Sequence, residues 1–143
     1  MKHIPSILKR FFWVIFLSVI VFVFFCLLTS HFYINTGSLN SIQITYIYND
    51  ANIVTSVQNK DDIQTLKDIC KGFQYTDNPS CGFSEDICIK FYNDNESIIF
   101  SPACDECPIL RINNSNKYIK LNENQYKKFK AIVEKYGMKF PCV

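Results

Sequence analysis

An apolar run, Phe11–Leu28, constrains this chain more than any other stretch. It carries no charged residue and one polar residue, Ser18, and the uncharged stretch continues to Ile34. A bilayer core of roughly 30 Å takes about 20 apolar residues in helical form. We therefore predict a transmembrane anchor over residues 11–34. The residues assigned to the membrane span are Phe11, Trp13 and Leu28.

The charges around this run predict its orientation. Lys2, Lys9 and Arg10 precede it, and the next cation is Lys60. Because basic residues flanking a span favour the cytoplasmic side, residues 1–10 are predicted to be a cytoplasmic tail. The remainder is then extracytoplasmic, on a single-pass protein of the cell membrane with the lipid bilayer as a partner. The chain carries 15 Lys and Arg against 13 Asp and Glu, and without the three leading cations no basic stripe is left for nucleic acid.

Three other interpretations of the run are open. A cleaved signal peptide has a shorter apolar core and a small-residue cleavage site, which Leu28-Thr29-Ser30 does not supply. A lipid-modified Cys26 would follow small residues, whereas Phe24 and Phe25 precede it. A buried core helix would need more surrounding fold than the rest of the chain easily provides. An uncleaved anchor is favoured, and a cleaved signal would export the remainder as well.

Six of the seven cysteines follow the apolar run, and only Cys26 lies within it. An even number of cysteines in an exported domain is typical of a disulfide framework, whose connectivity the sequence does not fix. The disulfide candidates are Cys70, Cys81, Cys88, Cys104, Cys107 and Cys142.

Residues 35–41 are polar and short, which predicts a stalk, and residues 42–143 are expected to form one domain. Alternating apolar residues predict six strands. Their ranges are Ile42–Tyr48, Ile53–Val57, Ile87–Tyr92, Ser97–Ser101, Ile109–Ile112 and Lys117–Leu121. Helical spacing predicts one helix over Asp61–Lys71, with Asp61 as its cap, and another that begins after Asn122 and ends at Gly137.

The predicted order is β-β-α-β-β-β-β-α, with short polar turns between neighbouring strands. Short turns imply antiparallel pairing, and two amphipathic helices need a sheet face to cover. We therefore expect an α+β protein with an N-terminal transmembrane helix, an antiparallel sheet and both helices on one face. The opposite face is then exposed or occupied by a partner.

The pair Cys104–Cys107 has CxxC spacing. Redox CxxC motifs depend on a stabilised thiolate, whereas Asp105 and Glu106 here raise the expected thiol pKa. Pro102 and Pro108 favour a loop. We therefore favour structural disulfides over redox catalysis. A zinc site from Cys81, Cys88, Cys104 and Cys107 is the other alternative, although it leaves two cysteines unexplained.

Hydrolytic chemistry has little support, because the two histidines, His3 and His31, precede the domain. The four glycines are isolated, so no phosphate-binding loop is present. No catalytic, cofactor or metal residue is assigned. Aromatic residues are candidates for a partner surface, although tyrosine at alternating strand positions more often packs the sheet. They are Tyr46, Tyr48, Tyr75, Phe83 and Tyr92.

Residues Cys81–Gly137 contain CGF, a strand pair, PACDEC, a hairpin ending KYIKL and a helix ending EKYG. This segment resembles small membrane-anchored or lipoprotein-like domains of Gram-positive bacteria. In those domains, a cysteine before the first strand and a cysteine after an aspartate in the central loop recur. The resemblance implies a Cys81–Cys107 disulfide, leaves Cys70, Cys88, Cys104 and Cys142 for two more, and brings no particular activity.

The sequence thus favours a membrane-anchored extracytoplasmic module that binds a membrane protein, a secreted protein or a peptide, and not an enzyme. A membrane-tethered thiol–disulfide or metal-handling protein is the alternative.

Overall fold

The computed structural model describes residues 6–142, and of helix residues 6–11 and 26–31 it describes the backbone alone. The chain divides into two compact units, Met1–Tyr33 and Ile34–Val143. Helix α1 (Ser6–Phe32) forms the first unit, and all remaining helices and the main sheet belong to the second.

The predicted fold class is wrong in its transmembrane helix. A span takes about 20 apolar residues, and in the described part of the chain no helix has both the length and the apolar character to cross a membrane. Helix α1 includes Lys9 and Arg10 near its start and polar residues near its end. Of the residues assigned to the span, Trp13 is exposed, whereas the side chains of Phe11 and Leu28 lie outside the described set.

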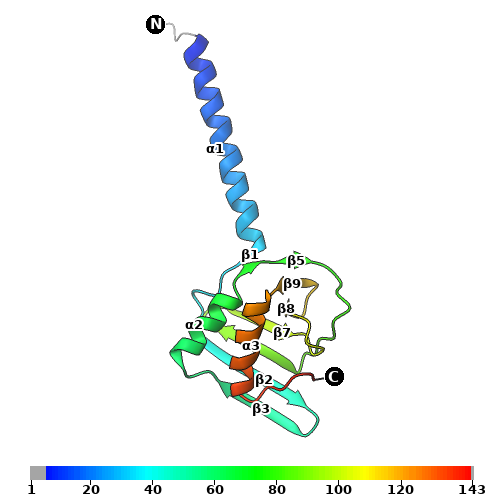
Figure 1. The fold of residues 1–143 in the computed structure, drawn as a ribbon. Coiled ribbons are helices and arrows are strands. Elements are labelled where there is room, and N and C mark those ends of the chain that lie inside the picture. Colours follow the sequence, from blue (N-terminus) through cyan, green and yellow to red (C-terminus); the bar gives the residue numbers. More distant parts are fainter. Residues whose placement is uncertain (1–5, 143) are drawn as a thin grey trace. The chain divides into compact units, whose positions relative to one another are not determined.

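The second unit is α+β, with an antiparallel sheet of seven strands in the order β3-β2-β6-β7-β8-β9-β5 (Figure 1). The larger strands have nearly the ranges that alternation predicts. They are β2 (Ser41–Tyr48), β3 (Ala51–Ser56), β6 (Ile87–Tyr92), β7 (Ser97–Pro102), β8 (Ile109–Ile112) and β9 (Lys117–Lys120). The short strands β1 (Tyr33–Ile34), β4 (Gly72–Phe73) and β5 (Tyr75–Thr76) were not predicted, because two residues show no period.

Helices α2 (Lys60–Ile69) and α3 (Glu123–Lys135) pack against each other and cover one face of this sheet (Figure 1). The core lies between them and the strands. Its helical contribution is Leu66, Ile69, Phe129 and Val133. From the strands come Ile42, Ile44, Ile87, Ile89, Phe91, Phe100, Leu110 and Ile112. Register partners such as Ile44 and Ile89 share a face, so one side of every central strand is apolar.

The predicted N-cap is confirmed for α3 and is wrong for α2. Asn122 caps α3 and forms the full capping box with Gln125, as expected. Asn59, and not Asp61, caps α2 by accepting hydrogen bonds from the backbone of Asp61 and Asp62. Asp61 is the second residue of the helix, where its negative charge interacts favourably with the positive end of the helix dipole.

Residues 35–41, expected as a stalk, pack against the domain. Leu39 is fully buried in the core, and the Thr36 hydroxyl donates a hydrogen bond to the Lys67 carbonyl of α2 at 2.8 Å. At the other end, Gly137 ends α3 with a φ of +98°, and Met138 is fully buried. The C-terminal tail therefore belongs to the folded body.

Candidate functional site

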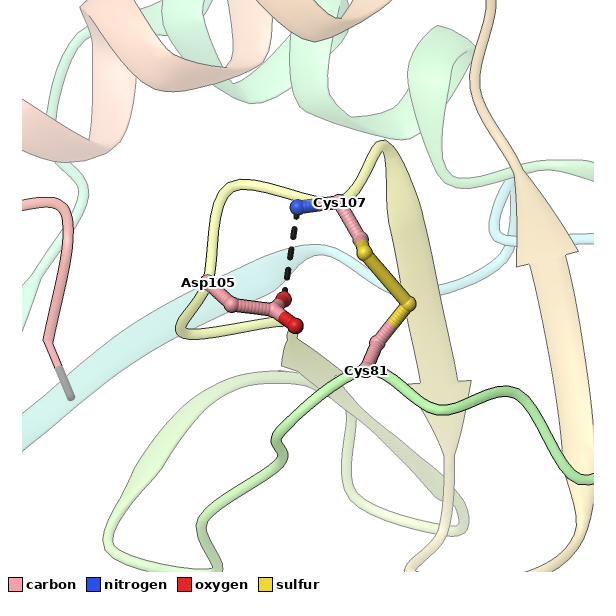
Figure 2. A group of neighbouring side chains, drawn as sticks. All are labelled: Cys81, Asp105 and Cys107. Carbon is pink, nitrogen blue, oxygen red and sulfur yellow. Dashed lines mark hydrogen bonds between the residues drawn. A yellow bond between two sulfur atoms is a disulfide. The ribbon is translucent and has the colours of Figure 1, made fainter.

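The first candidate site is a disulfide between two loops (Figure 2). Cys81 lies in the loop before β6, and Cys107 lies in the loop between β7 and β8. Their Cα atoms are 6.2 Å apart, within the usual range of disulfides, and their sulfurs are bonded. This is the pairing that the resemblance to lipoprotein-like domains implied. It ties together segments 26 residues apart in sequence.

Asp105 lies beside this disulfide and orders both loops. Its carboxylate accepts a hydrogen bond from the backbone N–H of Cys107 at 3.4 Å (Figure 2). It accepts another from the backbone N–H of Gly82 at 3.2 Å. Neighbouring Glu106 forms an ion pair with Lys130 of α3, which fixes the loop to the helix layer. A carboxylate in this position opposes a thiolate on either cysteine, so the arrangement suits a structural bond better than a redox centre.

Cys81, Asp105 and Cys107 also place three metal-ligating groups within 4.8 Å of one another. Both sulfurs are used by the disulfide, so only a reduced loop offers thiolate ligands. The four-cysteine zinc site considered from the sequence is not assembled. Neither Cys88 nor Cys104 joins this group, and no other potential metal-binding group occurs among residues whose side chains the structure describes.

The two cysteines of the CxxC motif contact different partner cysteines. Cys107 is bonded to Cys81, whereas Cys104 lies beside Cys142 of the C-terminal tail. The backbone N–H of Cys142 donates to the Cys104 carbonyl at 3.0 Å, and both residues are buried. Burial, with the hydrogen bond to the Cys104 thiol, raises the pKa of Cys142.

The remaining two cysteines lie on opposite faces of the sheet. Cys70, at the end of α2, is fully buried in the core, and this burial raises the pKa of its thiol well above the usual range. Cys88 alternates with buried Ile87 and Ile89, so it points to the other face, beside Thr45. The sheet therefore separates Cys70 from Cys88, and both are thiols.

The second candidate site is this other face of the sheet, which neither α2 nor α3 covers. We call it the uncovered face. Register places the following side chains on it: Gln43, Thr45, Ile47, Asn52, Val54, Ser56, Cys88, Lys90, Tyr92, Ile99 and Arg111. It is mixed in character. Val54 and Ile47 are large apolar side chains that are 57% and 42% exposed.

One end of the uncovered face is closed by aromatic residues. The Phe83 ring lies 5.6 Å from the Tyr118 ring, and Tyr118 in turn lies 5.9 Å from Tyr75. Tyr118 and the neighbouring Ser101 are buried. The accessible part of the face is therefore formed by β3, β2, β6 and the adjoining part of β7 and β8.

The charged side chains that the strands contribute to the uncovered face are both cations, Lys90 and Arg111. Lys90 lies over the Tyr92 ring at 5.6 Å, and the Arg111 guanidinium lies over the Phe83 ring at 5.3 Å. Arg111 also donates to Asn114, while its buried Nε has no acceptor among the described residues. Neither cation forms an ion pair in the described part of the chain, and strands β2, β3, β6, β7 and β8 contain no Asp or Glu.

The five aromatic residues that the sequence suggested as a partner surface do not form one surface in the structure. Tyr46 is buried on the core side and Tyr48 packs against the core, which is the packing role that alternation suggests. Tyr92 lies on the uncovered face, whereas Phe83 and Tyr75 close its end. Sequence reasoning missed Lys90 and Arg111. Each is a cation between two buried apolar residues in a strand, and that pattern marks a position on the opposite face.

Comparison with known proteins adds no assignment to either site. No protein-family model, curated protein or solved structure matches this chain.

Proposed function

We propose that residues 34–143 form an extracytoplasmic binding module, and that its uncovered face binds a partner protein or peptide that presents carboxylates next to apolar groups. The observation that carries this proposal is the composition of that face. It has two cations, exposed apolar side chains and Tyr92, and its strands contain no acid. Tyrosine and arginine are the residues that protein interfaces favour.

The electrostatics support the choice of an acidic partner. Lys90 and Arg111 hold their charges over aromatic rings and without a carboxylate partner among the described residues. A partner carboxylate therefore meets a cation that has no internal ion pair to break. Acidic side chains lie beyond the strand ends, at Asp86 and Glu96.

The placement outside the cytoplasm rests on the Cys81–Cys107 disulfide. Disulfides persist in oxidising compartments and are rare in a reducing cytosol. Nucleophilic catalysis has no support in residues 34–143. Both histidines of the chain precede this range, and none of the described cysteine thiols lies beside a general base.

Charge reversal tests the proposal. Full-length wild type, Lys90→Glu and Lys128→Glu chains are each used to retain partners from cells that express the chain natively. Lys128 is the matched control because it is exposed on α3, on the opposite side of the sheet. We expect Lys90→Glu to abolish retention of a protein that wild type and Lys128→Glu both retain, and added salt to weaken it. Equal retention by all three chains would contradict the proposal.

A further inference from the structure

Cys104 and Cys142 have the placement that a disulfide requires. The backbone N–H of Cys142 donates to the Cys104 carbonyl at 3.0 Å, and the two thiols are hydrogen-bonded to each other. A direct backbone hydrogen bond between two residues limits the distance between their Cα atoms to about 7 Å, close to the range in which disulfides form.

Contacts with the core hold the tail that carries Cys142 in a fixed position. Met138 is fully buried, and the Tyr46 hydroxyl is hydrogen-bonded to the backbone of Lys139. Both cysteines are almost completely buried, with 3% and 4% of their surfaces exposed. The two sulfurs are thus kept together by the surrounding fold and do not depend on a chance encounter.

We propose that Cys104 and Cys142 form a second disulfide, which fastens the C-terminal tail to the loop after β7. The Sγ atoms become bonded and each loses its hydrogen. The two electrons and two protons pass to an external disulfide, either of a thiol–disulfide oxidoreductase or of a small thiol, which is released as two thiols. The same class of oxidant is needed for the Cys81–Cys107 bond, so the pair requires no further reagent.

This assignment accounts for all six cysteines of the second unit. The CxxC motif supplies one sulfur to each of two disulfides, and Cys70 and Cys88 remain as thiols because the sheet lies between them. With the other four cysteines paired in this way, a third disulfide would have to join Cys70 to Cys88, and the sheet between them prevents this. The inference does not depend on the proposed binding function.

Burial also governs how easily an oxidant reaches this pair. With 3% and 4% of their surfaces exposed, Cys104 and Cys142 are poorly accessible to an external disulfide once the chain has folded. Reduced, fully folded chain should therefore oxidise more slowly than chain that folds in the presence of the oxidant.

Peptide mapping of the full chain tests the pairing directly. The chain is folded with a mixture of reduced and oxidised glutathione, unfolded without reductant, alkylated and digested. Asp105 and Glu106 lie between Cys104 and Cys107, so a protease specific for acidic residues separates the two cysteines. Trypsin releases Cys142 after Lys139. We expect the Cys142 fragment linked to the Cys104 fragment, with Cys70 and Cys88 alkylated.

Alkylated Cys142 in most molecules would overturn the proposal, and so would a link from Cys142 to Cys107. Two variants keep the result interpretable. In Cys142→Ser, Cys104 should become alkylated while Cys81 stays linked to Cys107. In Cys88→Ser, the matched control, both links should be unchanged. A Cys142→Ser chain in which Cys104 is still linked would contradict the assignment.

Discussion

Gly137 shows how a single residue fixes the end of α3. Its φ of +98° is a conformation that other residues rarely adopt, and an added Cβ would lie 2.7 Å from Cδ1 of Ile53. Backbone strain and a steric clash thus act at the same position. The consequence is a turn that brings the tail, and with it Cys142, back over the core.

We predict that Gly137→Ala lowers the free energy of unfolding by about 2 kcal/mol. Urea denaturation of the second unit, in wild type and variant, measures this change. Ile53→Val removes Cδ1 and therefore separates the two causes. If the clash contributes, the double variant loses less stability than the two single variants together. Strict additivity would mean that backbone strain alone is responsible.

Asp62 joins the two helices and makes their packing dependent on pH. It accepts hydrogen bonds from Lys135 Nζ at 2.7 Å and from the Tyr136 hydroxyl at 2.9 Å. The hydrogen bond from Lys135, with that from Tyr136, holds the pKa of Asp62 below its usual value. A carboxyl group whose pKa is lower in the folded state stabilises the fold above its unfolded-state pKa, and this stabilisation is lost as the pH falls through the folded-state value.

We therefore expect Asp62→Asn to destabilise the fold at neutral pH, with the difference from wild type shrinking below about pH 4. Denaturation midpoints measured across this range give the comparison. Asp61→Asn is the matched control, since Asp61 is exposed in the same helical turn and has no ion pair among the described residues. A difference between Asp62→Asn and wild type that stays constant down to pH 2 would contradict the role of this carboxylate.

At the level of elements, the Cys81–Cys107 disulfide joins two loops that have little regular structure of their own. The sheet contributes only an isolated bridge between Phe83 and Ala103 in this region. The covalent link therefore restricts the unfolded chain more than any neighbouring hydrogen bond does.

We predict that the double variant Cys81→Ser/Cys107→Ser loses about 2 to 4 kcal/mol of stability, as expected for closing a loop of this length. Thermal and urea denaturation without reductant measure the loss. Cys88→Ser should change stability much less, because Cys88 is an unbonded, half-buried thiol on the uncovered face. Equal losses in both variants would show that the disulfide is not the source of the effect.

The strands and both domain helices could be predicted because their apolar residues recur with a clear period. Ile87, Ile89 and Phe91 specify one face of β6, and Asn122 with Gln125 specifies the start of α3. The cap of α2 was misassigned because Asn59, Asp61 and Asp62 all have capping side chains, and only the local backbone selects among them.

The cysteine pairing was harder to predict from the sequence, because the spacing of cysteines does not show which loops meet in space. Cys142 lies at the end of the chain, yet a buried tail returns it to Cys104. The transmembrane prediction was wrong for a related reason. It was made from the length and apolar character of Phe11–Leu28 and from the cations before it, whereas no helix in the described residues is both long and apolar enough to cross a membrane.

At the scale of the whole molecule, two helices and the core occupy one side of the sheet and leave the other side to solvent. An antiparallel sheet is stable with one face in water. Such a face is usually polar, whereas this one exposes Val54 on β3 and Ile47 on β2 and carries cations on β6 and β8. We therefore propose that the uncovered face is the surface that binds a partner.

The most direct test places a photo-crosslinking amino acid at Val54, on the uncovered face, or at Ala131, on the exposed side of α3. Both full-length variants are irradiated in cells that express the chain natively. We expect a specific adduct from position 54, none from position 131, and loss of the adduct when Lys90→Glu is added. Equal adducts from both positions, or an adduct at position 54 that survives Lys90→Glu, would contradict it.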